Sequence, residues 1–323
     1  MSELALIERI AEGTTIRPGT ALGIGDDAAL VELGGLTVAT HDMLVEDVHF
    51  RLSTTTPGDL GAKALAVNVS DIAAMGAVPV AALVGLGIPA GMADDDVAAL
   101  SAGIEEVAAA HGMTVAGGDV TGAPVLVVGI TALGRPEDGV APVRRDTGRA
   151  GDVLCVTGPL GAAAAGLVLL ESPGLLPGLA GRDALIAAHR RPRPRVMAGR
   201  ALARGGARAM MDLSDGLALD AARLARASGL RAVIDLPSVP VAPGAAAVAA
   251  ATGADPAVAA ATGGEDYELL AAVPPERVEA LTRALGGGLR PVGVLAGGPS
   301  GVALVDGDGA EVVPERLGWE HRG

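Results

Sequence analysis

Aspartates recur along this chain in apolar or glycine-rich settings, where a carboxylate is costly. They are Asp26, Asp27, Asp42, Asp71, Asp119, Asp212 and Asp215. One such aspartate alone is typical of a helix cap or a turn. As a set they would repel one another if they converged, and the chain offers few cations near them, with Lys63 as its single lysine. Clusters of carboxylate oxygens suit Mg²⁺, which also binds substrate phosphates and water. The set therefore predicts a magnesium site.

Asp71 is the aspartate that the capping explanation fits least. It lies inside the run 64–75, which is apolar on nearly every side and predicts a helix over 58–75. Asn68 and Asp71 are three residues apart and share one face of that helix. A carboxylate buried in the middle of a helix needs a partner, so this face is predicted to point at other polar groups.

Two further segments could hold an anion. Gly117-Gly118-Asp119 lets backbone N–H groups approach a ligand closely, and Ser214-Asp215-Gly216 opens a predicted helix whose N-terminus favours negative charge. Carboxylates beside an anion site make sense with a metal between them, as in metal-assisted phosphoryl transfer. The residues thus predict a Mg²⁺-dependent enzyme acting on a nucleotide or phosphate ester.

Other phosphate chemistries do not fit the sequence. There is no Walker A loop and no kinase-type glycine-rich loop with its strand lysine. The run 23–28 matches G-x-G-x-x-A, but its adjacent aspartates would repel a pyrophosphate. No Ser, Cys or His stands in a recognisable nucleophile–base arrangement, so we expect direct transfer without a phospho-enzyme.

Composition narrows the class of protein. The formal charge is 24 − 38 = −14, which argues against nucleic-acid and anionic-membrane partners. Half of the residues are apolar, and the chain has one Trp, one Tyr and one Phe, so its core must be aliphatic. Cys155 stands alone in an apolar run and is expected to be a buried strand thiol. The acidic start and the Pro- and Gly-interrupted apolar stretches predict neither a signal peptide nor a membrane span, so we expect a cytoplasmic protein.

The predicted elements mix helices and strands without a strict βαβ rhythm, which favours an α+β fold over a doubly wound one. Strands are expected near 36–40, 43–48, 79–88, 125–133, 152–157, 208–212, 231–235, 267–273, 291–295 and 302–305, and helices near 58–75, 93–111, 159–170, 182–190, 194–204 and 216–228. The polar, turn-rich window 135–151 is the expected boundary. It gives an N-terminal domain over 1–136, with the metal and ATP site, and a C-terminal domain over 137–323 that completes the ATP and substrate sites.

Taken together, the motifs resemble the thiamine-monophosphate kinase family of the aminoimidazole ribonucleotide synthetase-like superfamily. The matching segments, in family order, are 23–28 (GIGDDA), 42–50 (DMLVEDVHF), 63–77 (KALAVNVSDIAAMGA), 117–119 (GGD), 212–217 (DLSDGL), 263–269 (GGEDYEL) and 318–321 (GWEH). They extend from residue 23 to the C-terminus. The pairing of SDG and GGEDYEL with a late GW-x-H is closer to this family than to its relatives.

The resemblance implies ATP-dependent phosphorylation of thiamine phosphate to thiamine diphosphate by in-line transfer with several Mg²⁺. It implies a homodimer in which the N-terminal domains pair their sheets into a barrel. Its metal ligands fall on Asp26, His41, Asp42, Asp71, Asp119, Asp212 and Asp215, of which Asp71, Asp119, Asp212 and Asp215 are the expected catalytic residues. Its nucleotide contacts fall on Gly118, Asp119, Arg145 and Ser214, and its thiamine phosphate contacts on His49, Glu265 and Trp319.

The chain departs from the family pattern at several positions. The family usually has Thr-Asp-Thr where His41-Asp42-Met43 stands, and glycine where Asp47 stands. Val120 replaces a usual Thr, and Arg322 stands where Phe is common. Two other functions remain open at this point: a related ATP- and Mg²⁺-dependent enzyme with a different acceptor, and a non-catalytic nucleotide-binding relative.

Overall fold

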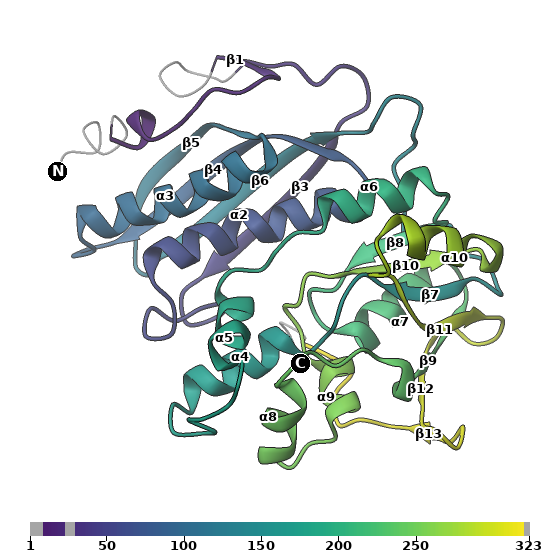
Figure 1. The fold of residues 1–323 in the computed structure, drawn as a ribbon. Helices are drawn as coiled ribbons and strands as arrows, with labels where there is room; N and C mark the ends of the chain where they lie inside the picture. Colours follow the sequence, from purple (N-terminus) through teal and green to yellow (C-terminus); the bar gives the residue numbers. More distant parts are fainter. Residues whose placement is uncertain (1–8, 23–29, 320–323) are drawn as a thin grey trace. The chain divides into compact units, whose positions relative to one another are not determined.

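The structure is a computed structural model that describes residues 9–22 and 30–319. The predictions for Asp26, Asp27 and His321 lie outside these residues. The chain forms two compact units (Figure 1), one made of residues up to Ile72 with Ala77–Glu137, and one made of Ala73–Gly76 with the residues from Asp138 onward. Both units mix helices and strands, as the sequence predicts.

The first unit is built on a four-stranded sheet in the order β3-β6-β4-β5. Its strands are β3 (Val38–Val45), β4 (Val78–Pro89), β5 (Thr114–Ala123) and β6 (Val127–Arg135), and a short ribbon pairs β1 (Thr20–Leu22) with β2 (Leu30–Val31). Strands β4 and β5 are parallel and the other neighbours antiparallel. Helices α2 (Pro57–Ala74) and α3 (Asp94–His111) lie across one face of this sheet (Figure 1).

Helix α2 is apolar on nearly every side because it is covered on nearly every side. Leu60, Leu65 and Ile72 are fully buried. Its contact with α3 is so close that a Cβ added at Gly61 would stand 1.9 Å from the Leu100 carbonyl oxygen. The glycine thus fixes the spacing of the helix that carries Asn68 and Asp71.

The second unit is built on a seven-stranded sheet in the order β13-β12-β9-β11-β7-β10-β8, in which only the β12–β9 pair is parallel. Its strands are β7 (Val153–Val156), β8 (Ala209–Asp212), β9 (Arg231–Asp235), β10 (Leu269–Val273), β11 (Arg290–Ala296), β12 (Gly301–Val305) and β13 (Glu311–Val312). Its helices are α4 (Ala162–Glu171), α5 (Arg182–Arg190), α6 (Val196–Arg204), α7 (Leu217–Ala227), η1 (Leu236–Ser238), α8 (Ala245–Ala251), α9 (Pro256–Thr262) and α10 (Pro275–Ala284). An aliphatic core packs between α7 and the sheet.

Most predicted elements appear within a few residues of their expected bounds, but two predicted strands are merged into one, and the sequence analysis gave no bounds for β5, α8, α9 or α10. The two strands expected at 36–40 and 43–48 are one continuous strand, β3. The segment Gly117-Gly118-Asp119, expected to precede a strand, lies inside β5, which the sequence analysis missed because its glycines suggest a turn.

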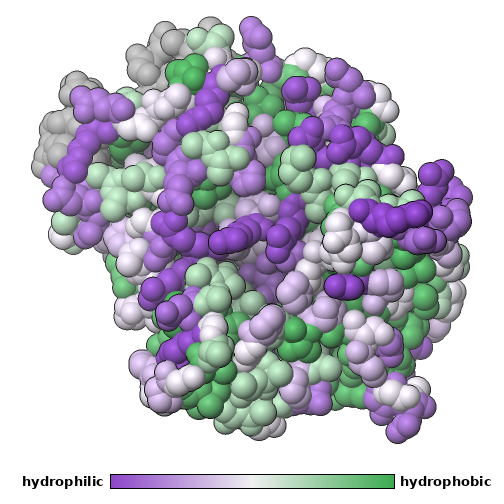
Figure 2. Space-filling model, viewed as in Figure 1, coloured by the Kyte–Doolittle hydropathy of each residue, from purple (hydrophilic) through white to green (hydrophobic). Residues whose placement is uncertain are grey.

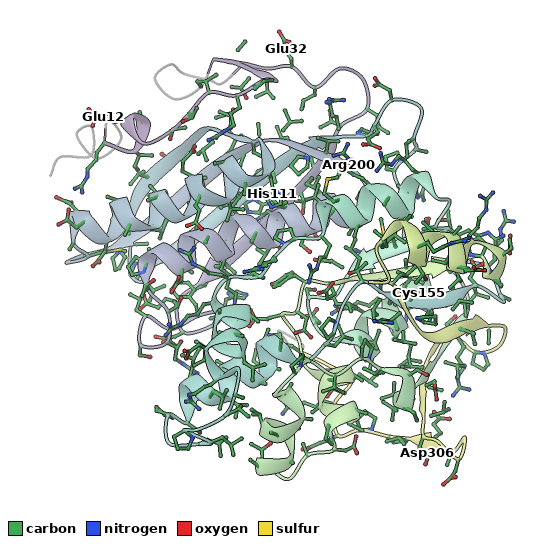
Figure 3. The ribbon with its side chains drawn as sticks, in the orientation of Figure 1. Glu12, Glu32, His111, Cys155, Arg200 and Asp306 are labelled. Atoms are coloured by element: carbon green, nitrogen blue, oxygen red, sulfur yellow. The ribbon has the colours of Figure 1, made fainter. Side chains whose placement is uncertain are left out.

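Cys155 lies in β7 (Figure 3) and is fully buried, as predicted. Burial raises the pKa of its thiol to about 12, so it is inert at neutral pH. On the face shown in Figure 2, hydrophilic and hydrophobic side chains are interspersed. Among the described residues, no helix is long and apolar enough to cross a membrane.

The helix contact at Gly61 gives a first testable prediction. In Gly61→Ala the new methyl meets backbone at 1.9 Å, so overpacking of about 1–3 kcal/mol should exceed the gain in helix propensity and lower the melting temperature. Gly58→Ala is the matched control in the same helix, because its Cβ would lie 3.5 Å from the nearest atom and the change should stabilise by about 0.5–1 kcal/mol. Equal melting temperatures for the two variants would contradict this account of the contact.

Candidate active site

In the first unit, hydrogen bonds between β3 and α2 involve the expected residues Asp42 and Asp71. The Thr40 hydroxyl donates to Asp71 Oδ2 at 2.5 Å. The backbone N–H of Asp42 donates to Asn68 Oδ1 at 3.0 Å, and the Asn68 amide donates to the Ala64 carbonyl at 2.9 Å. The shared face of Asn68 and Asp71 therefore points at polar groups, as predicted, and these belong to β3. Thr40 is the member of this group that sequence reasoning missed.

The two histidines near this edge differ in orientation. Side chains alternate along a strand, so the imidazole of His41 lies on the opposite face of β3 from the Asp42 carboxylate, with Nδ1 2.9 Å from Thr131 Oγ1 of β6. The two side chains therefore do not meet at one ion in this structure. His49 folds back on the end of β3, and its Nδ1 accepts the N–H of Val45 at 3.0 Å, which places the ring proton on Nε2.

Gly118 and Asp119 lie on β5, the other edge strand of the sheet. A Cβ at Gly118 would stand 1.9 Å from the Val84 carbonyl oxygen, so this position requires glycine. Both residues line a cavity of about 320 Å³ with a largely apolar wall that includes Ile10, Val84 and Ile104. The segment expected to contact a nucleotide thus borders a cavity.

Asp42 and Asp119 are separated by the width of the sheet, about 14 Å from three strand spacings of ~4.8 Å. Within residues 9–22 and 30–319 no three His, Cys, Asp or Glu side chains lie close enough to hold a metal ion. The expected ligand Asp26 is not among them. Asp71, Thr40 and Asn68 each carry a side-chain oxygen in this group, and oxygen is the donor that Mg²⁺ prefers.

In the second unit, the turn between β8 and α7 carries Asp212, Ser214 and Asp215. Asp212 is buried at the end of β8. Asp215 does not cap α7, since the N-cap is Gly216 with φ 116°. The carboxylate of Asp220 instead accepts the backbone N–H groups of Asp215 and Gly216 at 3.0 and 3.2 Å. A side chain of α7 itself therefore stabilises the turn that leads into this helix.

Arg223 joins this turn from one helical turn further on. Its Nη1 donates to Asp215 Oδ2 and, at 2.8 Å, to Asp220 Oδ1. Asp220 is fully buried, and this burial raises the pKa of its carboxyl to about 6. Sequence reasoning missed both residues, although an aspartate on the apolar face of an amphipathic helix is a signal of this kind.

The GGEDYEL segment runs beside this turn. The N–H groups of Glu265 and Tyr267 donate to the carbonyls of Ser214 and Leu213 at 2.8 and 3.0 Å, and Leu213 N–H donates to the Glu268 carbonyl at 2.8 Å. Glu265 and Tyr267 have φ of 69° and 50°, a conformation rare for such residues. Non-glycine residues held in this region cluster at functional sites.

The three acids of this segment have different surroundings. Asp266 accepts the N–H groups of Gly161 and Ala163 at the start of α4, at 2.6 and 3.1 Å. Glu268 is buried, accepts the Thr157 hydroxyl at 2.6 Å and forms a two-point ion pair with Arg195. Both are therefore structural.

Glu265 is the more exposed acid of the segment. Its Oε2 lies 3.1 Å from Nδ1 of the buried His189, an approach that lacks hydrogen-bond geometry. The exposure leaves Glu265, expected to contact the acceptor, as the acid of GGEDYEL that can face a ligand.

The C-terminal segment is tied to the Asp215 turn through its backbone. Trp319 N–H donates to the Asp215 carbonyl at 3.0 Å. A Cβ at Gly318 would stand 2.3 Å from that same oxygen, so the close approach depends on glycine. The Trp319 residue remains 53% exposed, so burial of its ring is not what holds the segment.

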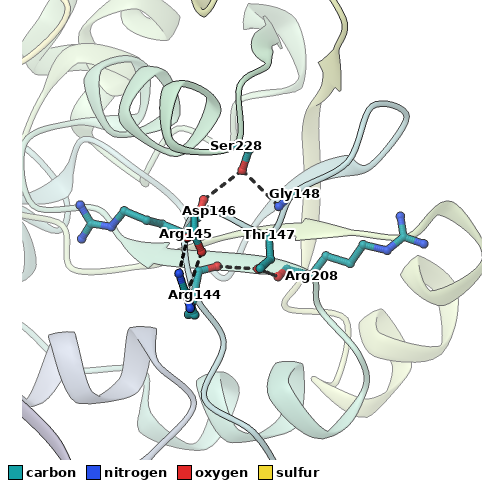
Figure 4. A network of polar contacts seen from close by, with 7 residues as sticks. All are labelled: Arg144, Arg145, Asp146, Thr147, Gly148, Arg208 and Ser228. Carbon is teal, nitrogen blue, oxygen red and sulfur yellow. Dashed lines mark hydrogen bonds and ion pairs between the residues drawn. The ribbon is translucent and has the colours of Figure 1, made fainter.

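Arg145 lies on an exposed turn that is fixed from two sides (Figure 4). The Ser228 hydroxyl at the end of α7 donates to the Arg145 carbonyl and accepts Gly148 N–H, both at 3.1 Å. The Thr147 hydroxyl bonds to the Arg144 and Arg208 carbonyls. An exposed guanidinium on a fixed turn suits contact with an anionic ligand.

The chain is similar to known proteins over most of its length. Residues 25–135 match the model of the AIR synthase related protein N-terminal domain, and residues 149–306 match that of its C-terminal domain. A curated thiamine-monophosphate kinase of Mycobacterium tuberculosis is 41% identical over 312 residues, 95% of this chain and 89% of that protein.

Two solved structures are also similar. The thiamine-monophosphate kinase of Stenotrophomonas maltophilia has a TM-score of 0.83 at 36% identity, covering 97% of this chain and 98% of the other. AaThiL complexed with AMPPCP and TMP has a TM-score of 0.79 at 31% identity, covering 98% and 95%.

Asp266 gives a prediction for pH dependence. Burial raises the pKa of its carboxyl to about 6 against 3.8 for the free group, so the protonated form is favoured by folding. That stabilisation is fully present below about pH 4 and is lost as the pH rises through 6. Urea unfolding should therefore show the parent gaining about 2–3 kcal/mol over Asp266→Asn between pH 7 and pH 4.

The control for losing a capping carboxylate is Asp255→Asn at the N-cap of α9. A stability difference between parent and Asp266→Asn that is the same at pH 7 and pH 4 would refute the role given to burial.

Proposed function

The chain belongs to the AIR synthase related protein family, within which it is a thiamine-phosphate kinase, and we propose which of its residues carry the reaction. The enzyme phosphorylates thiamine phosphate to thiamine diphosphate with ATP. The observation that carries this function is the 41% identity to a thiamine-monophosphate kinase over 95% of the chain. A different acceptor and a non-catalytic role are thereby disfavoured.

The proposed transfer is direct and in line. A phosphate oxygen of thiamine phosphate attacks the γ-phosphorus of ATP, one P–O bond forms as the bond to the ADP oxygen breaks, and the electron pair leaves with ADP. The chain's task is then positioning and charge stabilisation, as in other phosphoryl transfers. The absence of a nucleophile–base pair in the sequence supports this route.

We propose that several Mg²⁺ ions bind through Asp26, Asp42, Asp71 and Asp119 of the first unit and through Asp212 and Asp215 of the second. The carboxylate oxygens of these residues fit this ion, and Mg²⁺ is commonly held by one or two carboxylates together with water and substrate phosphates. When bound, it supplies positive charge to the phosphates. Thr40 and Asn68 orient Asp71 and Asp42. The imidazole of His41 faces away from Asp42, so His41 could contribute only through its main chain.

For the nucleotide, we propose that the base of ATP occupies the cavity bordered by Gly118 and Asp119. A wall of aliphatic side chains suits an aromatic base. In the second unit, Ser214 lies in the turn that precedes α7 and Arg145 is exposed on its fixed turn, so both are suited to phosphate oxygens.

For the acceptor, we propose contacts from His49, Glu265 and Trp319. The ring proton on Nε2 of His49 can donate to a phosphate oxygen. Glu265 and an indole face both attract the cationic thiazolium. The strained backbone at Glu265, held by the Ser214 carbonyl, supports a binding role for this residue.

We propose a homodimer in which the sheets of the first unit pair into a barrel. Strand positions His41, Thr131 and Leu83 lie in register across the sheet, on the face opposite the Asp42 side chain. Met43, two residues on from His41, is 51% exposed and Leu83 is 40% exposed, so apolar groups stand open on this face. The supply of ATP and the solitary buried thiol are consistent with the cytoplasm.

The function and its metal are tested by one substitution. Asp71→Asn keeps the shape of the side chain and the Thr40 contact but removes a carboxylate, so turnover should fall at least 100-fold while the melting temperature changes little. The measurement is ADP release with ATP, thiamine phosphate and Mg²⁺. Asp96→Asn, the same change at an exposed site on α3, is the control. Parent-like turnover by Asp71→Asn, or full activity in excess EDTA, would overturn the metal role.

The role of Trp319 is tested on binding. If the indole faces the thiazolium, Trp319→Ala should weaken thiamine phosphate binding about 2- to 30-fold while ATP binding is nearly unchanged. The fluorescence of this sole Trp should also respond to thiamine phosphate. Leu317→Ala in the same segment is the control. Unchanged affinity with no fluorescence response in the parent would remove Trp319 from the site.

A further inference from the structure

Arg223 is a cation placed directly on a proposed metal ligand, and no step above uses it. Its Nη1 bridges Asp215 Oδ2 and Asp220 Oδ1. Its side chain is 38% exposed, whereas that of Asp220 is fully buried and that of Asp215 is 18% exposed. The guanidinium therefore offsets part of the negative charge of the two carboxyl groups, Asp215 before α7 and Asp220 in its first turn.

The bridge holds Asp215 in a defined position. Asp220 accepts the N–H groups of Asp215 and Gly216, so the backbone and the side chain of Asp215 are both secured to the Asp220–Arg223 pair. The turn is consequently held by contacts within the protein itself. The same bridge places a full positive charge at the carboxylate oxygen that a metal would seek.

We propose that Arg223 is a resident counter-ion that competes with Mg²⁺ for Asp215 and so sets the Mg²⁺ concentration at which this ligand is loaded. The proposal rests on the metal role proposed for Asp215. A Mg²⁺ ion binds carboxylate oxygen at about 2.1 Å, so an unmoved guanidinium would stand beside a divalent cation and repel it. On loading, Arg223 gives up Asp215, keeps Asp220 and turns toward the solvent that already reaches it.

The competing role and a purely structural role of Arg223 predict opposite changes in Mg²⁺ affinity when Arg223 is removed. If Arg223 only shapes the turn, its removal disorders Asp215 and weakens the metal. If it competes, its removal strengthens the metal, because a repelling charge is lost while Asp220 still holds the backbone of the turn through two N–H groups.

The experiment is calorimetric titration of the full chain with MgCl₂ alone, without nucleotide. Arg223→Gln should bind Mg²⁺ about fivefold or more tightly than the parent, and its metal-free melting temperature should be lower. Arg223→Lys keeps the charge and should stay within about twofold of the parent. Arg226→Gln removes the same charge from the exposed end of α7 and is the matched control, also expected within about twofold.

Unchanged or weaker Mg²⁺ binding by folded Arg223→Gln would overturn the proposal, as would equal tightening in Arg226→Gln. If Arg223→Gln does not fold, Asp220→Asn/Arg223→Gln replaces the buried pair by neutral groups, and the same tightening is required of it. Asp215→Asn tests the metal role of Asp215 separately from the counter-ion role of Arg223. If Asp215→Asn binds Mg²⁺ as the parent does, Asp215 is not a ligand and the metal assignment fails. If its binding is weaker but Arg223→Gln is not tighter than the parent, the counter-ion role alone fails.

Discussion

The binding of backbone N–H groups by the buried carboxylate of Asp220 is the interaction on which the second unit's site depends. A fully buried carboxylate is unfavourable unless several donors satisfy it, and here the donors are Asp215 N–H, Gly216 N–H and the Arg223 guanidinium. In satisfying itself, Asp220 fixes the turn that carries Ser214 and Asp215. The carbonyls of this turn then align two further segments, because the Ser214 carbonyl accepts the N–H of Glu265 and the Asp215 carbonyl accepts the N–H of Trp319.

The same principle divides the acids of GGEDYEL by role. The carboxyl group of Asp266 accepts two N–H groups at the start of α4, and that of Glu268 bonds Thr157 and Arg195, so both side chains hold the scaffold together. Glu265 stands between them in the chain but has a left-handed backbone and greater exposure. The three acids that are close together in the sequence therefore have two roles. Asp266 and Glu268 stabilise the fold, and Glu265 is able to contact a ligand.

The spacing of apolar and polar residues in the sequence predicted the features that depend on neighbouring residues alone. The period of α2 located the helix and the shared face of Asn68 and Asp71, because both follow from 3.6 residues per turn. The glycines at 117 and 118 hid the strand β5, in which Gly118 permits a close approach to the Val84 carbonyl of the neighbouring β4. Thr40 and Ser228 were missed because their partners, Asp71 and the Arg145 carbonyl, are set by tertiary packing, which no spacing in the sequence encodes. Arg223 was missed although its partner Asp220 is only three residues away on the same helix.

The departures from the family pattern can now be weighed by their backbone geometry. Asp47 stands where glycine is usual, and its φ of 63° explains that usage. Aspartate is among the few non-glycine residues that enter this region at modest cost, so the turn joining β3 to His49 is preserved. At position 41 the threonine hydroxyl is lost, yet the side chain there faces Thr131 and not Asp42, so a hydroxyl would also have pointed away from Asp71. The hydroxyl that reaches Asp71 belongs to Thr40, one residue earlier, and this chain retains it.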